Sequence, residues 1–316
     1  CARELGVMDG LAAGRLLLNS LVVFAPQRAF DERSDIFYYR VIQSVSKGLA
    51  SHDVRLRYCA LEENDSDAQL FLARMNEPET QAAILLGIDD PHIYDLAVDV
   101  GKPCMLINCR DRHMRLPAVA PDHRAIGERA ADYLFEMGHR EVMNVLCLRR
   151  YTMELRLAGI RDAWQSHNLK FNDKRDLLVA PSFSARETEE LVTSWLRQMQ
   201  GKDLPTAFLV GGDFMAAGTI SALQKQGLRV PQDISVMSID GFNLAAIQDV
   251  PLTAVHVPRD ELGTEAVHML QQRLMRPDAP VGTLLLNGTL AVRGSVRRIR
   301  QGKRRTAVER EGLYDN

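Results

Sequence analysis

The chain has 316 residues, of which 46% are hydrophobic and 25% are charged, and its formal net charge is −2 at pH 7. This length predicts two domains, and the composition is that of a globular protein rather than a disordered or fibrous one. The near-neutral charge argues against a general polyanion binder but allows a local DNA-contacting element. No apolar run reaches transmembrane length, and the first residues lack the pattern of a signal peptide. We therefore expect no membrane partner.

Strand-like and helix-like segments alternate from residue 21 onward. A first series places strands at residues 21–25, 54–60, 82–86 and 104–108 and helices at 36–51, 67–76, 91–98 and 124–137. A second series places strands at 142–148 and 176–179 and helices at 154–167 and 185–199. The chain closes with a strand at 253–257, a helix at 261–276, an apolar run at 283–286 and a strand near 289–293. Two successive series of this kind predict two similar α/β lobes.

Residues 205–240 contain a strand–helix–strand unit. A strand at 206–210 is followed by Gly211 and Gly212, and Asp213 can cap the helix that comes next. A second strand at 234–239 ends at Asp240. Such a unit implies parallel strands, and ligands bind beyond the carboxyl ends of parallel strands in open α/β sheets. Asp213 and Asp240 are therefore candidate ligand contacts.

The same segment, PTAFLVGGDFMAAGTISALQKQGLRVPQDISVMSID, resembles the lactose-repressor (LacI/GalR) family of bacterial transcription regulators. The resemblance implies a periplasmic-binding-protein-like fold, in which two Rossmann-like parallel-sheet lobes enclose a ligand cleft. It implies an N-terminal lobe of residues 21–138 plus 258–284 and a C-terminal lobe of residues 139–257 plus 285–300, with crossings near Gly138, Pro258 and Leu286. It also implies a cytoplasmic homodimer that binds a small-molecule effector and operator DNA and represses genes of carbohydrate or related metabolism.

Residues 1–20 resemble the join between the DNA-binding head and the core in this family. Arg15 and Leu16 match its hinge helix, in which a leucine wedges between base steps in the DNA minor groove. Two glycines in this stretch each lower helix propensity by about 1 kcal/mol, so a disordered leader is the alternative. The helix-turn-helix would precede Cys1, and we expect the chain to be the core of a longer repressor.

The C-terminal residues 301–316 form a basic tail. It is interpreted either as a solvated extension or as a non-specific DNA contact. It lacks apolar heptads, which argues against a helical tetramerisation segment.

The resemblance implies an effector site drawn from both lobes. Its candidate residues are Phe37, Tyr38, Asp122, Thr152, Arg156, Phe183, Asp213 and Asp240. An arginine can hold a carboxylate, a phosphate or a pair of sugar hydroxyls, a carboxylate can accept hydrogen bonds from hydroxyls, and an aromatic ring can stack on a ligand. The alternatives are structural. The aspartates can cap helices, which is the favoured role of Asp213, and the aromatic rings can pack in the core.

Two departures from the family pattern bear on the identity of the effector. Gly212 and Gly241 stand where the family usually carries polar residues, which indicates a different ligand orientation or a larger ligand. Arg149 and Arg150 replace a Gly-Pro-like turn, and with Arg156 they would place three guanidinium groups near the site. They are candidate anion contacts for a sugar acid or a sugar phosphate. The alternative is that Arg149 and Arg150 point to solvent.

The sequence argues against cofactor, metal or enzyme chemistry. The five cysteines form no Cys-x-x-Cys pair, and Cys59, Cys104 and Cys147 lie in apolar runs. We expect free thiols in a reducing cytoplasm and no metal site. Phosphate-binding glycine loops, His-Glu-x-x-His and Gly-x-Ser-x-Gly motifs are missing from the sequence. A solute-binding protein of a sugar transporter is the alternative function, and a sugar-active enzyme on this fold is a third.

Overall fold

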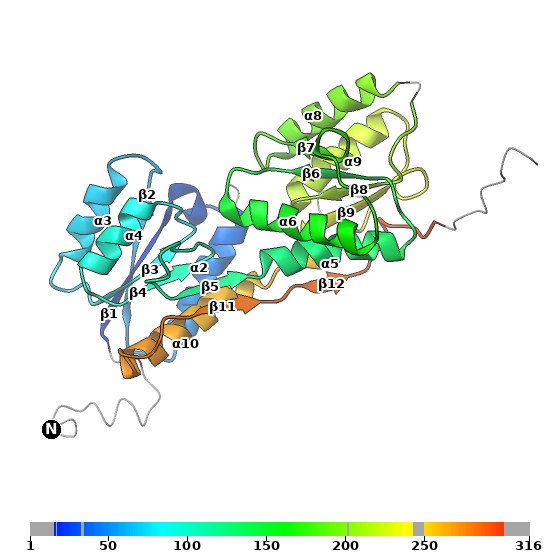
Figure 1. Cartoon of the computed structure of the whole chain (residues 1–316). Helices are drawn as coiled ribbons and strands as arrows, with labels where there is room; N and C mark the ends of the chain where they lie inside the picture. Colours follow the sequence, from blue (N-terminus) through cyan, green and yellow to red (C-terminus); the bar gives the residue numbers. More distant parts are fainter. Residues whose placement is uncertain (1–15, 17, 33–34, 201, 243–249, 300–316) are drawn as a thin grey trace, which may run out of the picture. The chain divides into compact units, whose positions relative to one another are not determined.

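The computed structural model of the chain describes residue 16 and residues 18–32, 35–200, 202–242 and 250–299 (Figure 1). The chain forms two compact units, each made of separate stretches of sequence. The first unit comprises residues 1–126, 150–152 and 257–289, and the second comprises residues 127–149, 153–256 and 290–316. The main crossings lie after Ile126, His256 and Thr289, compared with the predicted positions near Gly138, Pro258 and Leu286.

The first unit is built on a six-stranded sheet in the order β11-β5-β4-β3-β1-β2, whose neighbouring strands pair in parallel. Its strands are β1 (Ser20–Pro26), β2 (Arg55–Leu61), β3 (Ala82–Leu86), β4 (Cys104–Ile107), β5 (Ala118–Pro121) and β11 (Thr283–Leu286). Its helices are the 3-10 helix η1 (Gln27–Phe30), α2 (Ile36–Leu49), α3 (Asp67–Met75), α4 (Pro91–Asp99) and α10 (Arg259–Met275). Helices α2 and α10 cover one face of the sheet, and α3 and α4 cover the other.

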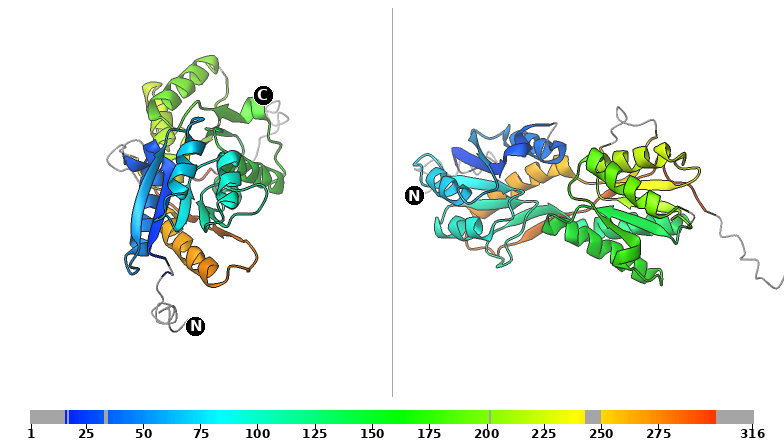
Figure 2. Two further views of the ribbon diagram at one scale, coloured as in Figure 1. Left: turned by 90° about the vertical axis from the view of Figure 1, so that its left-hand side faces the viewer. Right: turned by 90° about the horizontal axis from the view of Figure 1, so that it is seen from above.

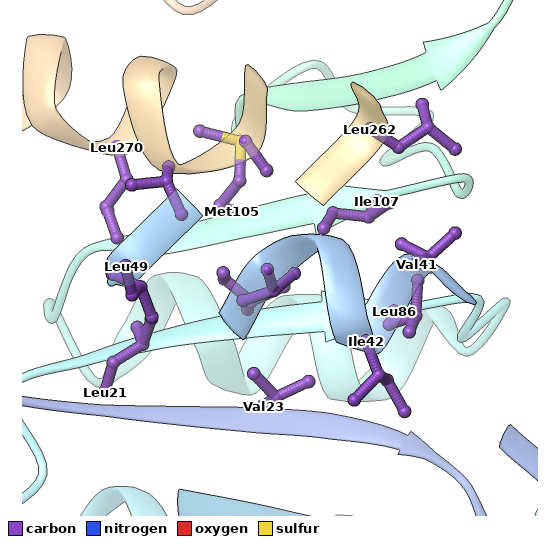
Figure 3. Packing of buried hydrophobic residues seen from close by; sticks show 14 of the residues in the cluster. Leu21, Val23, Val41, Ile42, Leu49, Leu86, Met105, Ile107, Leu262 and Leu270 are labelled. Carbon is purple, nitrogen blue, oxygen red and sulfur yellow. The ribbon is translucent and has the colours of Figure 1, made fainter. Parts of the chain in front are cut away.

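The alternation of side chains along each strand decides which face a residue joins. In β1, Leu21 and Val23 pack with α2 and α10, as Figure 3 shows for part of this cluster. Val22 and Phe24 of the same strand pack with α3 and α4. Because both faces are covered, the strands are apolar almost throughout, which is why they are recognisable as continuous hydrophobic runs.

Helices α2 and α10 lie side by side in Figures 1 and 2. Ser44 of α2 donates a hydrogen bond to the carbonyl of Asp260 in α10, 216 residues away in the sequence. A Cβ atom on Gly263 would lie 2.2 Å from the backbone nitrogen of Val45, so only glycine permits this close approach. The last helix of the first unit is thereby fixed against its first long helix.

The second unit repeats the plan with the strand order β12-β10-β9-β8-β6-β7. Its strands are β6 (Val142–Leu146), β7 (Leu177–Val179), β8 (Ala207–Val210), β9 (Ser235–Asp240), β10 (Thr253–His256) and β12 (Thr289–Ala291). Its helices are α5 (His123–Glu136), which begins in the first unit, α6 (Tyr151–Ser166), α7 (Asp173–Asp176), α8 (Ala185–Gln198) and α9 (Asp213–Lys225). Helices α8 and α9 cover one face of the sheet, and α5 and α6 cover the other (Figure 1).

The predicted architecture of two parallel-sheet α/β lobes is confirmed, but one strand was not predicted. Strand β5 is flanked by Pro117 and ends at Pro121, residues that are typical of loops. The backbone nevertheless pairs, because Pro117 contributes its carbonyl to the amide of Leu106 and needs no N–H to do so. Because of these prolines, β5 was not recognised as a strand from the sequence.

Two smaller expectations concern the cysteines and the membrane. Cys59, Cys104 and Cys147 are buried, as predicted, and Cys109 is buried as well; these four cysteines of the described part of the chain are free thiols. Among the described residues, no helix is long and apolar enough to cross a membrane.

Candidate functional site

Polar and aromatic side chains gather beyond the carboxyl ends of the parallel strands in each unit. This edge is where open α/β sheets bind ligands. In the second unit it brings together three of the predicted residues, Arg156, Phe183 and Asp240. In the first unit it brings together Phe37 and Tyr38, with several charged residues that were not predicted.

Arg156 ties two strand ends of the second unit together. Its side chain lies in α6 and is buried, so its charge requires internal partners. Nη1 donates to the carbonyl of Gly211, just after β8, at 2.8 Å, and Nη2 donates to Oδ1 of Asp240, at the end of β9, at 3.2 Å. The Asp240 side chain is 18% exposed, so part of its carboxylate is accessible to a ligand.

Gly212 lies between the Asp240 carboxylate and the Phe183 ring. A Cβ atom at Gly212 would lie 3.1 Å from Oδ2 of Asp240 and 3.9 Å from Cδ1 of Phe183. Phe183 is 39% exposed, so part of its ring is accessible to a ligand. A carboxylate, an aromatic ring and a position without a side chain thus lie close together in the second unit.

Gly241, the other glycine at a usually polar position, has a backbone explanation. Its φ is +74°, a left-handed conformation that favours glycine. A Cβ atom there would also lie 2.7 Å from Cα of His256 in the neighbouring strand β10. Gly241 thus satisfies the tight turn after Asp240, whose own φ is +131°. In this chain Gly241 therefore has a structural role that does not depend on the ligand.

The favoured role of Asp213 as a helix cap is wrong. Gly212 is the N-cap residue of α9, and Asp213 makes no capping bond. Its carboxylate instead accepts hydrogen bonds from the Ser238 hydroxyl and from the backbone amides of Gly241, at 3.3 Å, and Phe242, at 2.6 Å. The residue is buried, and both oxygens serve the turn that follows β9. Asp213 therefore positions Asp240.

Tyr38 forms the centre of the corresponding set in the first unit. Its buried ring lies against Gly87, where a Cβ atom would be 2.5 Å from Cζ of Tyr38. Its hydroxyl accepts a hydrogen bond from Nδ2 of Asn108 at 2.9 Å, and Oδ1 of Asn108 lies 2.7 Å from Nε2 of the buried His123. Asn108 directly follows β4, and His123 lies two residues after the end of β5. Residues at two strand ends therefore hold the tyrosine hydroxyl in place.

Two guanidinium groups flank the Tyr38 ring, with Arg28 centred 5.9 Å and Arg150 centred 5.4 Å from the ring centroid. Such distances are those of cation–π contacts. Arg28 pairs with Asp35 at 3.2 Å and also with Glu63. The Arg28 side chain is 34% exposed, whereas the Arg150 side chain is only 14% exposed.

Arg150 has its own partners in the first unit. Nε donates to Oδ2 of Asp89 at 2.8 Å, and Nη2 donates to the Asn108 carbonyl at 3.0 Å. Burial, and then the like charge of Arg28, lower the pKa of Arg150 to about 10. Burial, and then the Glu63 carboxylate, raise the pKa of Asp89 to about 6. The predicted alternative that Arg150 points to solvent is wrong, because a carboxylate and a carbonyl hold it.

The other predicted residues of the first unit have mixed surroundings. Phe37 packs edge-on against Tyr38, with ring centroids 5.3 Å apart. Asp122 accepts a hydrogen bond from the amide of Ala125 at 3.0 Å and so caps α5, the structural role considered for it. The Thr152 hydroxyl is buried and has no hydrogen-bond partner in the described part of the chain.

Three predictions concern residues outside these two sets. Arg149 is exposed, as one alternative expected. Arg15 and the tail at residues 301–316 lie outside the described residues. Leu16 is 7% exposed and packs in the hydrophobic core of the first unit, where its amide bonds to His52. Its contact with DNA stays a prediction.

Asn108 and Asp89 were not among the residues predicted from the sequence. Both follow buried strands, Asn108 directly after β4 and Asp89 shortly after β3. The rule that singled out Asp240 at the end of β9 would have found them as well. Arg28 and Asp35, by contrast, are seven residues apart in a stretch of sequence that carries no recognisable motif.

Comparison with known proteins defines the class. Residues 131–296 match the model of the periplasmic binding protein-like domain. The HTH-type transcriptional repressor CytR of Escherichia coli (strain K12) is 26% identical over 315 residues, covering 94% of this chain and 85% of CytR. The repressor PurR of Klebsiella pneumoniae (strain 342) is 30% identical over 241 residues, covering 70% of this chain and 68% of PurR.

Solved structures agree on the fold. The transcriptional regulator CelR in complex with cellobiose aligns with a TM-score of 0.76 at 18% identity, covering 93% of this chain and 90% of CelR. The fold is thus that of the periplasmic-binding-protein-like regulators. The chain belongs to the LacI family of transcriptional regulators and is an effector-binding core of that family, rather than a transporter's binding protein.

Proposed function

We propose that this core serves a cytoplasmic repressor of carbohydrate or related metabolism. It binds a small-molecule effector, forms a homodimer, and contacts operator DNA through a head domain that precedes residue 1. Effector binding shifts the core between two states, and operator affinity changes through that coupling. We propose no catalytic role, and the named relatives are regulators.

The observation that carries this proposal is the set of groups beyond the ends of β8 and β9 in the second unit. Arg156 holds Asp240 at 3.2 Å, and Phe183 presents an exposed ring across Gly212. A carboxylate accepts hydrogen bonds from hydroxyls, while a ring face packs against the C–H surface of a sugar. These groups therefore fit a sugar, a sugar acid or a sugar phosphate. The cellobiose bound to the structurally similar CelR supports a sugar.

The remaining proposed contacts have different roles. In the first unit, Tyr38, Asp122 and Thr152 offer hydroxyl and carboxylate groups, and Phe37 supports the Tyr38 ring. In the second unit, Asp213 acts indirectly by holding the turn after Asp240. Arg149, which is exposed, is the candidate for an anionic group on the effector.

A thermal-shift screen of neutral sugars, sugar acids and sugar phosphates tests the proposal. A ligand that binds only the folded state stabilises it by about 2.7 kcal/mol at a concentration of a hundred times Kd. We expect at least one compound to give a saturable shift that Asp240→Asn abolishes. The same compound should change operator binding by the full-length gene product. A hit that Asp240→Asn leaves unchanged, or one without effect on operator binding, would contradict the proposal.

A further inference from the structure

The charges around Tyr38 in the first unit are compensated within the protein. Two guanidinium groups, those of Arg28 and Arg150, flank the ring. Three carboxylates face them: Asp35 and Glu63 pair with Arg28, and Asp89 pairs with Arg150. Two positive and three negative charges leave this cluster with an excess of negative charge.

Of the two arginines, Arg150 is the less exposed, and its charge therefore depends more on partners within the protein. Its Nε donor is engaged by Asp89 at 2.8 Å and its Nη2 donor by the Asn108 carbonyl at 3.0 Å. An incoming phosphate or carboxylate would compete with Asp89 for the same charge. It would also meet the repulsion of the neighbouring carboxylates, which costs more when the groups are removed from water.

We infer that Arg150 is a positioning residue for Tyr38 and not an anion receptor, so that the effector presents an uncharged, hydroxyl-bearing surface to the first unit. This inference rests on the proposed function, since it names the chemical class that the Tyr38 cluster accepts. By this inference Arg150 is not an anion contact, and Arg149 of the second unit remains the candidate for that role.

The hydrogen bonds of Tyr38 support a neutral partner. The hydroxyl oxygen accepts from Nδ2 of Asn108, and the opposite side of that amide, Oδ1, is engaged by Nε2 of His123. With the amide held this way, the tyrosine proton is free to be donated, and no acceptor for it is present among the described residues. A hydroxyl of a neutral polyol can accept that proton and needs no counter-charge.

Removal of the compensating carboxylate tests the inference. Asp89→Asn keeps the shape of the side chain but leaves the Arg150 charge without its partner. Asp95→Asn is the matched control, because Asp95 pairs with Arg115 at 2.8 Å in the same unit and its loss changes the net charge equally. The probe is inorganic phosphate, titrated calorimetrically at constant ionic strength and at a pH well above the Asp89 pKa of about 6.

We expect Asp89→Asn to bind phosphate about tenfold more tightly than Asp95→Asn, the effect of one additional charge-assisted hydrogen bond. The gain should disappear in the double variant Asp89→Asn with Arg150→Gln. In the otherwise unchanged chain, Arg150→Gln should leave phosphate affinity unaltered. Equal phosphate affinity in the two single carboxylate variants would overturn the inference, as would a loss of phosphate binding on Arg150→Gln alone.

The phosphate titration is independent of the identity of the effector. If the charge variants behave as expected but no sugar changes operator binding, the proposed function fails and the inference about Arg150 stands. If a sugar effector is found and wild-type Arg150 binds phosphate, the inference alone fails.

Discussion

Arg156 and Asp240 are 84 residues apart in the sequence, yet Nη2 of the arginine lies 3.2 Å from Oδ1 of the aspartate in the second unit. The pair links α6 to the end of β9, and Nη1 of Arg156 donates to the carbonyl of Gly211, directly after β8. Three elements of the second unit therefore converge on one buried guanidinium. Substitution of Arg156 should therefore lower both the affinity for the effector and the stability of the second unit.

Replacement of Arg156 by lysine should weaken effector binding. Lysine keeps the charge but has no planar fork to engage Gly211 and Asp240 together. We expect Kd to rise by about tenfold to a hundredfold, equivalent to about 1.4–2.8 kcal/mol, in calorimetric titration with the sugar identified by screening. Arg161→Lys is the control, because Arg161 lies on the same helix but pairs with Asp173 at the surface. A similar loss in both variants would show that the effect is not local.

Replacement of Gly212 by alanine should weaken effector binding. The φ of Gly212 is −172°, an extended conformation open to any residue, so the backbone is not strained. The new methyl group would lie 3.1 Å from Oδ2 of Asp240 and would displace that carboxylate. Because Gly212 is buried and alanine is a poorer N-cap residue than glycine, we expect a loss of about 1 kcal/mol of stability, and effector affinity lower by about tenfold, or 1.4 kcal/mol.

Gly282→Ala provides the matched control for that experiment, because a Cβ atom at Gly282 would meet nothing within 4 Å. Its effector affinity should equal that of the wild type. Unchanged affinity in Gly212→Ala, measured beside this control, would place the effector away from Asp240 and Phe183.

Much of the fold can be predicted from the sequence because parallel strands buried on both faces are apolar runs of a recognisable length. The same logic finds polar residues at strand ends, such as Asp240. It does not reveal which partners those residues take. Asp213 stands at the start of a helix and is therefore expected to cap it, but β9 and the turn after it offer three donors that engage the carboxylate instead.

Long-range ion pairs are hidden from sequence patterns for the same reason. Arg150 and Asp89 are 61 residues apart and belong to no common motif. From the sequence alone, two adjacent arginines indicate either an anion site or a solvated turn. Only the approach of the β3–α4 loop to residue 150 shows a third outcome, in which Asp89 compensates the charge.

Asp213→Asn should destabilise the second unit. The carboxylate accepts hydrogen bonds from two backbone amides and a hydroxyl, whereas an asparagine side chain has one oxygen and would turn an NH2 group toward at least one of those donors. A buried donor left unsatisfied costs about 1–3 kcal/mol. Trp164 and Trp195 both lie in the second unit, so urea denaturation followed by tryptophan fluorescence measures the change there. Asp233→Asn, at a surface pair with Arg229, is the control and should cost clearly less.

The buried His139 should make the stability of the second unit fall in acid. Its ring is fully buried, with Nδ1 2.9 Å from the Thr206 hydroxyl and Nε2 3.1 Å from the Arg297 carbonyl. Burial lowers the pKa of His139 to about 4, whereas a histidine in the unfolded chain titrates near 6.5. Between these two values the unfolded state binds a proton that the folded state does not, so stability decreases as the pH falls through this window.

The full window corresponds to about 3 kcal/mol, because each pKa unit is worth about 1.36 kcal/mol. His139→Gln retains a donor for the Arg297 carbonyl and an acceptor for Thr206 but does not titrate. We expect its free energy of unfolding, measured by tryptophan fluorescence, to lose about 2 kcal/mol less than that of the wild type between neutral pH and pH of about 5. His92→Gln, on the exposed side of α4, should follow the wild-type curve. Parallel curves for wild type and His139→Gln would mean that another buried group carries the acid sensitivity.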